Sequence, residues 1–381
     1  MHAITAHPLR RTRRIIVATA LAAVALPATA QAADVTAAGT EIVVEDRVAR
    51  FGQPNRITAE TLPGGELRLV DTVALVNKAA SCVQVTALEV RCVRPAASPI
   101  TKLTVRTGGQ GDRFRMHGSL PVRYEGGAGD DAYIGAGRAG VPTQVDFAGG
   151  GDLGDLADYS LAGEGIDVRK NERGNDGRVA TGDRDNIRDD VAMVRGTRLR
   201  DILHGGAAYE VFEPQAGDDF VLGGTGITVV DMGAAPDGAD RILGAIGTTV
   251  SYERRTRAVR AAVDSGGADD GEAGERDELI QVGHVIGGSA ADTMLVPLHR
   301  IDGLGIAFDG GPGADTIDGT DARDVLTGGS GRDRMSAFGG DDQLTAADGE
   351  PDSLFGGAGR DTAKTDAAET TVRDVEVRTT P

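Results

Sequence analysis

The sequence predicts an all-β fold, a parallel β-roll or β-solenoid of nine-residue repeats, with an N-terminal β cap and two inserted loops. One reason is periodicity, because residues Gly310 to Thr345 divide into four units of nine residues that share their fixed positions. The other is composition, since the 381 residues include 56 glycines, 3% aromatic residues and no tryptophan. A solenoid buries one row of side chains per strand and therefore needs few large aromatic residues.

Every unit of this stretch has aspartate at position six and an apolar residue at position eight. The template is GGxGxDxUx, in which U is a large apolar residue, and the unit that contains Asp333 matches it at every fixed position. The glycine-rich first six residues predict a tight turn, because glycine adopts positive φ without steric cost. The last three predict a short strand whose middle side chain points inward. Two units make one coil, so Asp315 is expected to stack on Asp333, and Asp324 on Asp342.

Stacked carboxylates repel one another unless a cation lies between them. Turn carbonyl oxygens nearby would complete the all-oxygen shell, of roughly six to eight ligands, that Ca²⁺ accepts. The nonapeptide resembles the RTX (haemolysin-type) calcium-binding repeat, in the variant found in secreted bacterial proteins with an N-terminal signal peptide. The resemblance implies calcium as the cofactor, with about two to five ions per chain. The candidate metal-binding residues are Gly310, Gly311, Gly313, Asp315, Asp324, Gly328, Gly329, Gly331, Asp333, Gly340, Asp342, Asp352, Gly356, Gly357, Gly359 and Asp361, with Asp131, Asp201 and Asp219 upstream.

Residues 1–32 read as a signal peptide, because arginines precede an apolar run and small residues at 30 and 32 suit cleavage after Ala32. The run is shorter than the roughly 20 residues that a membrane span requires, so no transmembrane anchor is expected. The arginine pattern leaves the general secretory route and the twin-arginine route both open. The chain is thus expected to be secreted and extracellular. Its net charge of −18 favours cations and argues against nucleic acid as a partner.

The segment 33–107 is expected to form the N-terminal β cap, which would cover the open end of the first coil. Its two cysteines, Cys82 and Cys92, flank runs that alternate apolar and polar residues and so predict a hairpin. In an oxidising compartment the pair is expected to form a disulfide across the base of that hairpin.

The roll is expected over 108–378, interrupted at about 158–195 and 251–286 by two similar stretches that read as two copies of one larger coil with a protruding loop. These loops either bind a cell surface or polysaccharide, or are tolerated insertions. At the start of the roll, Arg113 occupies the expected position of the calcium aspartate. Between the insertions Asp201 and Asp219 are expected to stack, while Glu210 and Thr228 replace aspartate in the intervening units. These coils are expected to rely mainly on packing, with at most one weak site.

No catalytic constellation is evident, since the sequence contains neither an HExxH zinc motif nor a GxSxG nucleophile elbow. The leading hypothesis is a secreted, non-enzymatic calcium-binding repeat protein with a structural or surface-interaction role and calcium-coupled folding. One alternative is an adhesin or glycan-binding module that uses the inserted loops. A second alternative is a secreted hydrolase with RTX-like repeats as its folding aid.

Overall fold

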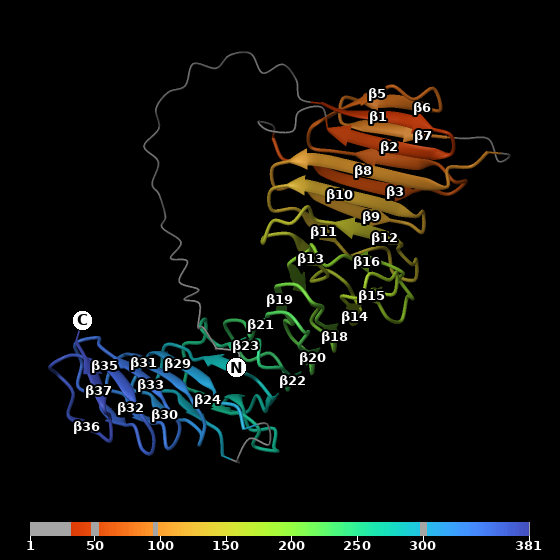
Figure 1. Ribbon diagram of the computed structural model, residues 1–381. Coiled ribbons are helices and arrows are strands. Elements are labelled where there is room, and N and C mark those ends of the chain that lie inside the picture. Colours follow the sequence, from red (N-terminus) through yellow and green to blue (C-terminus); the bar gives the residue numbers. More distant parts are fainter. Residues whose placement is uncertain (1–31, 47–52, 94–97, 298–302, 381) are drawn as a thin grey trace, which may run out of the picture.

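The computed structural model describes residues 32–46, 53–93, 98–297 and 303–380, and these contain strands but no helix. Figure 1 shows the strands stacked along a bent path, from the N-terminal cap to the C-terminal coils. Most neighbouring strands run parallel, one coil above the next. The predicted all-β roll is therefore confirmed. In the part of the chain that the structure describes, no helix is long and apolar enough to span a membrane.

One side of the roll, the long face, is a continuous column of parallel strands. Its strands are β3 (Arg56–Thr61), β9 (Arg113–His117), β11 (Ala132–Ile134), β13 (Leu156–Asp158), β17 (Met193–Arg195), β19 (Glu210–Glu213), β21 (Thr228–Asp231), β23 (Thr248–Ser251), β27 (His284–Ile286), β29 (Ala307–Pro312), β31 (Val325–Ser330), β33 (Gln343–Ala346), β35 (Thr362–Thr365) and β37 (Val377–Thr379). Antiparallel strands β4 (Leu67–Val70), β7 (Glu89–Cys92) and β6 (Cys82–Thr86) extend it at the N-terminal end.

The other side, the segmented face, consists of three separate sheets. The first contains β5 (Ala74–Asn77), β1 (Ala32–Ala38), β2 (Glu41–Asp46), β8 (Lys102–Gly109), β10 (Val122–Ala128), β12 (Val145–Ala148) and β16 (Asn186–Ile187). The second contains β15 (Gly177–Arg178), β14 (Ile166–Arg169), β18 (Ile202–His204), β20 (Phe220–Leu222), β22 (Arg241–Leu243) and β26 (Glu278–Ile280). The third contains β25 (Gly271–Glu272), β24 (Val259–Ala262), β28 (Thr293–Leu295), β30 (Thr316–Asp318), β32 (Arg334–Ser336), β34 (Ser353–Phe355) and β36 (Thr371–Arg373).

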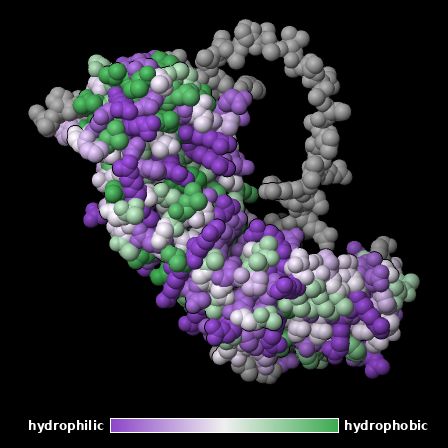
Figure 2. Space-filling view, turned by 180° about the vertical axis from the view of Figure 1, so that it is seen from behind, coloured by the Kyte–Doolittle hydropathy of each residue, from purple (hydrophilic) through white to green (hydrophobic). Residues whose placement is uncertain are grey.

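The core is the row of inward side chains between the two faces. In the C-terminal coils it contains the eighth residue of each repeat, and Ile317, Leu326, Met335 and Leu344 are all at most 1% exposed. Because each short strand buries only its middle residue, the core is long and narrow. Figure 2 shows more hydrophobic surface over the N-terminal cap than over the C-terminal coils on the side that faces the viewer.

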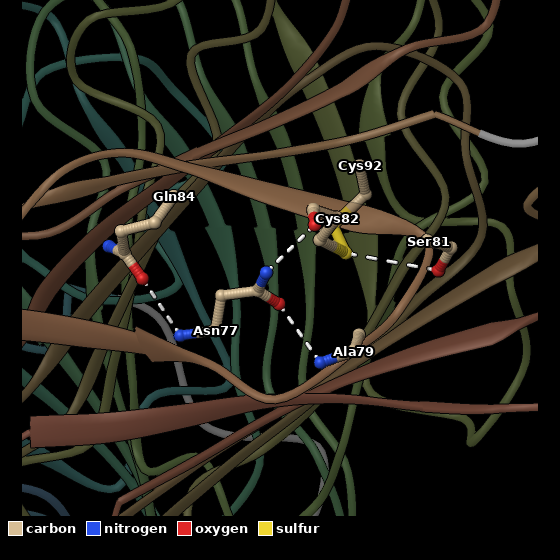
Figure 3. The surroundings of a disulfide bond; sticks show 6 residues. All are labelled: Asn77, Ala79, Ser81, Cys82, Gln84 and Cys92. Carbon is tan, nitrogen blue, oxygen red and sulfur yellow. Dashed lines mark hydrogen bonds between the residues drawn. A yellow bond between two sulfur atoms is a disulfide. The ribbon is translucent and has the colours of Figure 1, made fainter.

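The predicted disulfide is present, with an S–S distance of 2.01 Å between Cys82 and Cys92. It joins β6 and β7, which pair antiparallel as the expected hairpin. Asn77 supports the same corner (Figure 3), because its side chain donates to the Cys82 carbonyl at 2.8 Å and accepts the Ala79 N–H at 2.9 Å. The end of the hairpin is therefore held by a covalent bond and by hydrogen bonds.

The two insertions stay within the roll for much of their length. In the first, β14 stacks parallel on β18 and β16 stacks on β12. In the second, β24 stacks on β28 and β26 on β22. Their inward residues, including Val168 and Ala261, are fully buried. The nine-residue frame fails there because each coil is longer and contains a short antiparallel pair, β14–β15 or β24–β25, while the chain stays in the roll.

The predicted domain boundaries at 32 and 107 remain predictions. Strand β1 begins at Ala32, and the rest of the predicted signal segment lies outside the described residues. Strand β8 runs from Lys102 to Gly109 across the second boundary and pairs with β10 of the first coil.

Candidate metal centres

The aspartate at position six of each C-terminal repeat is buried and bonded to the aspartate of the neighbouring coil. Oδ1 of Asp333 accepts the backbone N–H of Asp315 at 2.8 Å, and Oδ1 of Asp352 accepts that of Asp333 at 2.7 Å. The other edge repeats this, since Asp342 accepts from Asp324 at 2.8 Å and Asp361 accepts from Asp342 at 3.0 Å. The predicted stacking of Asp315 on Asp333 and of Asp324 on Asp342 is confirmed, and it continues to Asp352 and Asp361, each 19 residues further along the chain.

The same bond links four series of aspartates, which we call aspartate ladders. The four ladders are Asp112–Asp131–Asp155, Asp201–Asp219–Asp240–Asp277, Asp292–Asp315–Asp333–Asp352 and Asp324–Asp342–Asp361. The first and fourth ladders precede strands of the long face, whereas the second and third precede strands of the segmented face. One oxygen of each carboxylate is thus used to hold the coils in register.

The second carboxylate oxygen divides the turns into two kinds. In the open turns, Oδ2 is buried and has no hydrogen-bond partner among the described residues. These belong to Asp112, Asp131, Asp155, Asp219, Asp240, Asp315, Asp333, Asp342, Asp352 and Asp361. In the closed turns, Oδ2 accepts the N–H of the second residue of its own turn, as Asp201 does from Thr197 (2.6 Å), Asp292 from Gly288 (2.6 Å) and Asp324 from Thr320 (2.5 Å).

The backbone of the second turn residue separates open from closed turns. In eight of the ten open turns the second residue can be identified, and its φ lies between 67° and 123°. These residues are Gly108, Gly127, Gly150, Gln215, Gly311, Gly329, Phe338 and Gly357. The N–H of Gly127, for example, donates to the Gly149 carbonyl at 2.8 Å and not to Asp131, the aspartate of its own turn. Thr197, Gly288 and Thr320 do not adopt positive φ. Gln215 and Phe338 hold a conformation that costs a side-chain-bearing residue on the order of 1–3 kcal/mol.

The first glycine of each repeat makes room for the free oxygen. A Cβ on Gly328 would lie 2.4 Å from Oδ2 of Asp333, and one on Gly356 would lie 2.6 Å from Oδ2 of Asp361. Either contact is too short for a real side chain, so in these two turns glycine allows the carboxylate to lie against the backbone. The template therefore specifies a cradle for an anionic oxygen as well as a tight bend.

The ladders hold several buried carboxylates in close succession. Burial and, after it, the carboxylate of Asp333 raise the pKa of Asp315 to about 7. Burial and the neighbouring carboxylates of the same ladder raise the pKa of Asp342 to about 7 and that of Asp131 to about 8. An unpaired buried carboxylate is costly, and it either takes up a proton or binds a cation.

The donor set fits calcium. The free atoms are hard anionic oxygens, which Ca²⁺ prefers, and no thiol or imidazole takes part in the ladders. No three acidic, histidine or cysteine side chains within the described ranges are gathered closely enough to hold a metal by themselves. Main-chain carbonyl oxygens of the turns would therefore have to complete the shell.

Of the predicted ligand aspartates, Asp131, Asp219, Asp315, Asp333, Asp342, Asp352 and Asp361 carry the free oxygen, whereas Asp201 and Asp324 are closed. Sequence reasoning placed Arg113 at the ladder position of the first coil, and that is wrong. Gly108 pairs with Gly127, so Thr107 takes the place of the first glycine and Asp112 joins the ladder. A frame that starts at Thr107 would have found it.

Asp155 was also missed, because its unit is longer than nine residues. The last aspartate before each break in the segmented face is closed by tyrosine. Tyr252 donates its hydroxyl to Oδ2 of Asp277 at 2.9 Å, and Tyr159 donates to Oδ2 of Asp185 at 3.1 Å. Sequence periodicity carries no signal for these hydroxyl contacts.

The comparison with known families agrees with this geometry. A family model described as RTX calcium-binding nonapeptide repeat (4 copies) matches residues 309–344, which contain the three open turns of Asp315, Asp333 and Asp342 and the closed turn of Asp324. No curated protein matches the chain.

Proposed function

We propose, from the premise that the chain is an RTX-type calcium-binding repeat protein, that it is secreted and non-enzymatic and that it folds fully only when calcium is bound. The single observation that carries the proposal is the row of buried carboxylate oxygens without partners in the open turns. A cation that binds these oxygens only in the folded roll stabilises the folded state.

The C-terminal open turns of Asp315, Asp333, Asp342, Asp352 and Asp361 are the principal proposed sites, together with that of Asp131 near the N-terminus. The closed turns of Asp201 and Asp324 serve as ends of their ladders, because a peptide N–H occupies the place of the cation. Gly311, Gly329, Gly331, Gly340, Gly357 and Gly359 support the open turns, and all have positive φ. Export through the proposed signal segment would bring the chain into a calcium-rich medium.

Circular dichroism and thermal unfolding of the chain without residues 1–32 test this proposal. We expect cooperative unfolding in calcium, and a lower midpoint with a weaker β-sheet signal after chelation with EDTA. Readdition of calcium should restore both, whereas magnesium at the same concentration should not, because Mg²⁺ demands smaller octahedral sites. An identical spectrum and midpoint in EDTA would refute calcium-coupled folding.

A further inference from the structure

The N-terminal cap presents a group of arginines on the outer surface of a chain whose net charge is −18. Strands β7, β4, β3 and β9 lie side by side in the long face, and alternate residues of each point outward. The outward charged residues are five arginines and two glutamates, namely Arg56, Arg68, Arg91, Arg113 and Arg115, with Glu60 and Glu89. The C-terminal coils with their aspartate ladders lie at the other end of the roll (Figure 1).

Two pairs of these arginines lie directly opposite each other on neighbouring strands. Arg68 on β4 is paired in register with Arg91 on β7, and Arg56 on β3 is paired with Arg113 on β9. Neighbouring strands are about 4.8 Å apart, so each pair brings two like charges together. Like charges in directly opposite positions destabilise a sheet unless a counter-charge lies between them.

The first pair has a counter-charge from the protein itself. Oε1 of Glu89 accepts a hydrogen bond from Nε of Arg68 at 3.0 Å and another from Nε of Arg91 at 2.8 Å. These two bonds are the main reason that the pKa of Glu89 is lowered to about 2. The bridge between the two guanidinium groups is therefore a carboxylate that stays ionised at neutral pH.

The second pair has no such bridge. Within the described ranges, the side chains of Arg56 and Arg113 make no ion pair or hydrogen bond, and neither does that of Arg115, two residues along β9. Arg56 and Arg113 are exposed. The adjoining carboxylates of Asp71 and Asp112 are turned inward, because they are 2% and 0% exposed and accept backbone N–H groups.

The positions around these three arginines are uncharged. Thr58 lies opposite Arg115, and Val70 lies on the far side of Thr58. Ala132 and Ile134 of β11 flank the two arginines of β9. We call the three arginines and Thr58 the unbridged cluster. It offers three guanidinium groups and one hydroxyl to a ligand and contains no carboxylate.

We propose that the unbridged cluster binds the sulfate or phosphate groups of an acidic extracellular polysaccharide. The ligand is anionic, because it takes the place that Glu89 has between the other arginine pair. A carboxylate has two oxygens, whereas a sulfate or phosphate monoester presents three terminal oxygens to the three planar guanidinium forks. Salt screens charges over about 8 Å at physiological ionic strength, so the distant acidic coils do not cancel the attraction.

A polymer fits the cluster better than a free ion does. A single exposed ion pair contributes little, whereas a polymer presents many charged groups, so that a released group is replaced by its neighbour. No phenylalanine, tyrosine or tryptophan occupies an outward position of the four described strands, so the aromatic platforms on which nucleic acid bases stack are missing there. The extracellular source of the polymer rests on the proposed secretion.

The test measures binding of the protein to dextran sulfate, with uncharged dextran as the reference polymer, in calcium. We expect dextran sulfate to bind, dextran not to bind, and the affinity to fall as salt rises. Arg56→Gln combined with Arg113→Gln should weaken binding about tenfold, because two exposed ion pairs are lost. Arg113→Lys keeps the charge without the planar fork and should weaken binding several-fold. It also serves as the second variant if the double replacement folds poorly.

The matched control is Arg332→Gln combined with Arg360→Gln, which changes the net charge equally at two exposed positions of the C-terminal coils. This control should bind dextran sulfate as the wild type does. The cluster is overturned if the wild type does not bind, if both double variants lose the same affinity, or if Arg113→Lys binds as tightly as the wild type.

Two further probes test the source of the anion. Sodium sulfate that binds as tightly per sulfate group as dextran sulfate would overturn the polymer in favour of a free ion. Tighter binding to phosphatidylglycerol vesicles would overturn it in favour of a membrane surface. All of these measurements are made in calcium and leave the comparison in EDTA untouched, so failure of this site and failure of calcium-coupled folding are distinguishable.

Discussion

Replacement of Asp342 by asparagine should destabilise the roll when calcium is present, and should stabilise it or leave its stability unchanged when calcium is absent. Oδ1 of Asp342 accepts the Asp324 N–H at 2.8 Å, and asparagine can keep that bond. Oδ2 is buried and has no partner among the described residues, so asparagine replaces only the free anionic oxygen. The substitution therefore separates the ladder bond from the metal ligand.

Without calcium at pH 8, Asp342→Asn should stabilise the roll or leave its stability unchanged. Burial and the carboxylates of Asp324 and Asp361 raise the pKa of Asp342 to about 7, so at pH 8 the fold holds a costly charge that asparagine removes. With calcium at 100 times its dissociation constant, a lost site costs about 2.7 kcal/mol of unfolding free energy. The variant should then be less stable than the wild type by roughly that amount.

Asp324→Asn is the matched control on the same ladder. Oδ2 of Asp324 accepts the Thr320 N–H at 2.5 Å, so an amide NH₂ in that position would face another donor. This closed turn should lose about 1–3 kcal/mol both with and without calcium. Guanidinium unfolding of the wild type, Asp342→Asn and Asp324→Asn, each in EDTA and in calcium, measures the six unfolding free energies. The division into open and closed turns is wrong if Asp342→Asn destabilises equally in both buffers, or if Asp324→Asn changes sign.

Three further predictions follow from particular contacts. Gly331→Ala should lower the unfolding free energy by about 1–3 kcal/mol more than Gly349→Ala does. Both glycines have positive φ, but only a Cβ at 331 meets a neighbouring carbonyl oxygen, at 1.6 Å. Equal losses of unfolding free energy in chemical unfolding would contradict the close-packing argument. In EDTA the melting temperature should fall as pH rises from about 4 to about 8, because the raised pKa values of Asp342 and Asp315 stabilise the metal-free roll only while these carboxyls are protonated. Calcium binding should release protons in the same pH range. A melting temperature that does not change with pH would contradict this account. Replacing Cys82 and Cys92 by serine should lower the unfolding free energy by about 2–4 kcal/mol and leave the calcium isotherm unchanged; a changed isotherm would link the cap to the metal sites.

The parts of the fold that sequence reasoning predicted correctly are those that local pattern determines. Apolar residues at the eighth position, such as Leu326 and Met335, are buried because a three-residue strand leaves them no other direction. The stacking of Asp315 on Asp333 was predicted because two nine-residue units make one coil. The disulfide was predicted because the two cysteines flank a hairpin pattern.

The parts that sequence reasoning missed depend on backbone geometry or on longer coils. Gly288 and Gly329 are both glycine at the second turn position, yet only Gly329 has positive φ, so residue type alone does not separate a closed turn from an open one. Phe338 adopts positive φ although it is not glycine. The insertions break the nine-residue period because each coil there is longer and contains a short antiparallel pair.

Removal of either insertion would therefore not be a clean test of surface binding. Deletion of 158–195 would take away β14, β15, β16 and β17. Of these, β14 pairs with β18, β16 with β12, and β17 with β13 and β19. Loss of binding after such a deletion would follow from misfolding alone. Substitution of exposed residues within the insertion, such as Leu161 and Val179, which are 65% and 61% exposed, leaves the sheets intact and tests the adhesin hypothesis directly.

The breaks in the segmented face and the ends of the ladders coincide, which limits how far calcium binding can be coupled along the roll. The second ladder begins with the closed turn of Asp201 and ends at Asp277, whose second carboxylate oxygen accepts the Tyr252 hydroxyl. The third ladder then starts again from the closed turn of Asp292. Because hydrogen bonds from the protein itself satisfy the aspartates at these junctions, no cation is needed there. Each ladder can thus gain or lose calcium as a unit, and the coils between the C-terminal block and the cap can stay folded by packing when the block is empty.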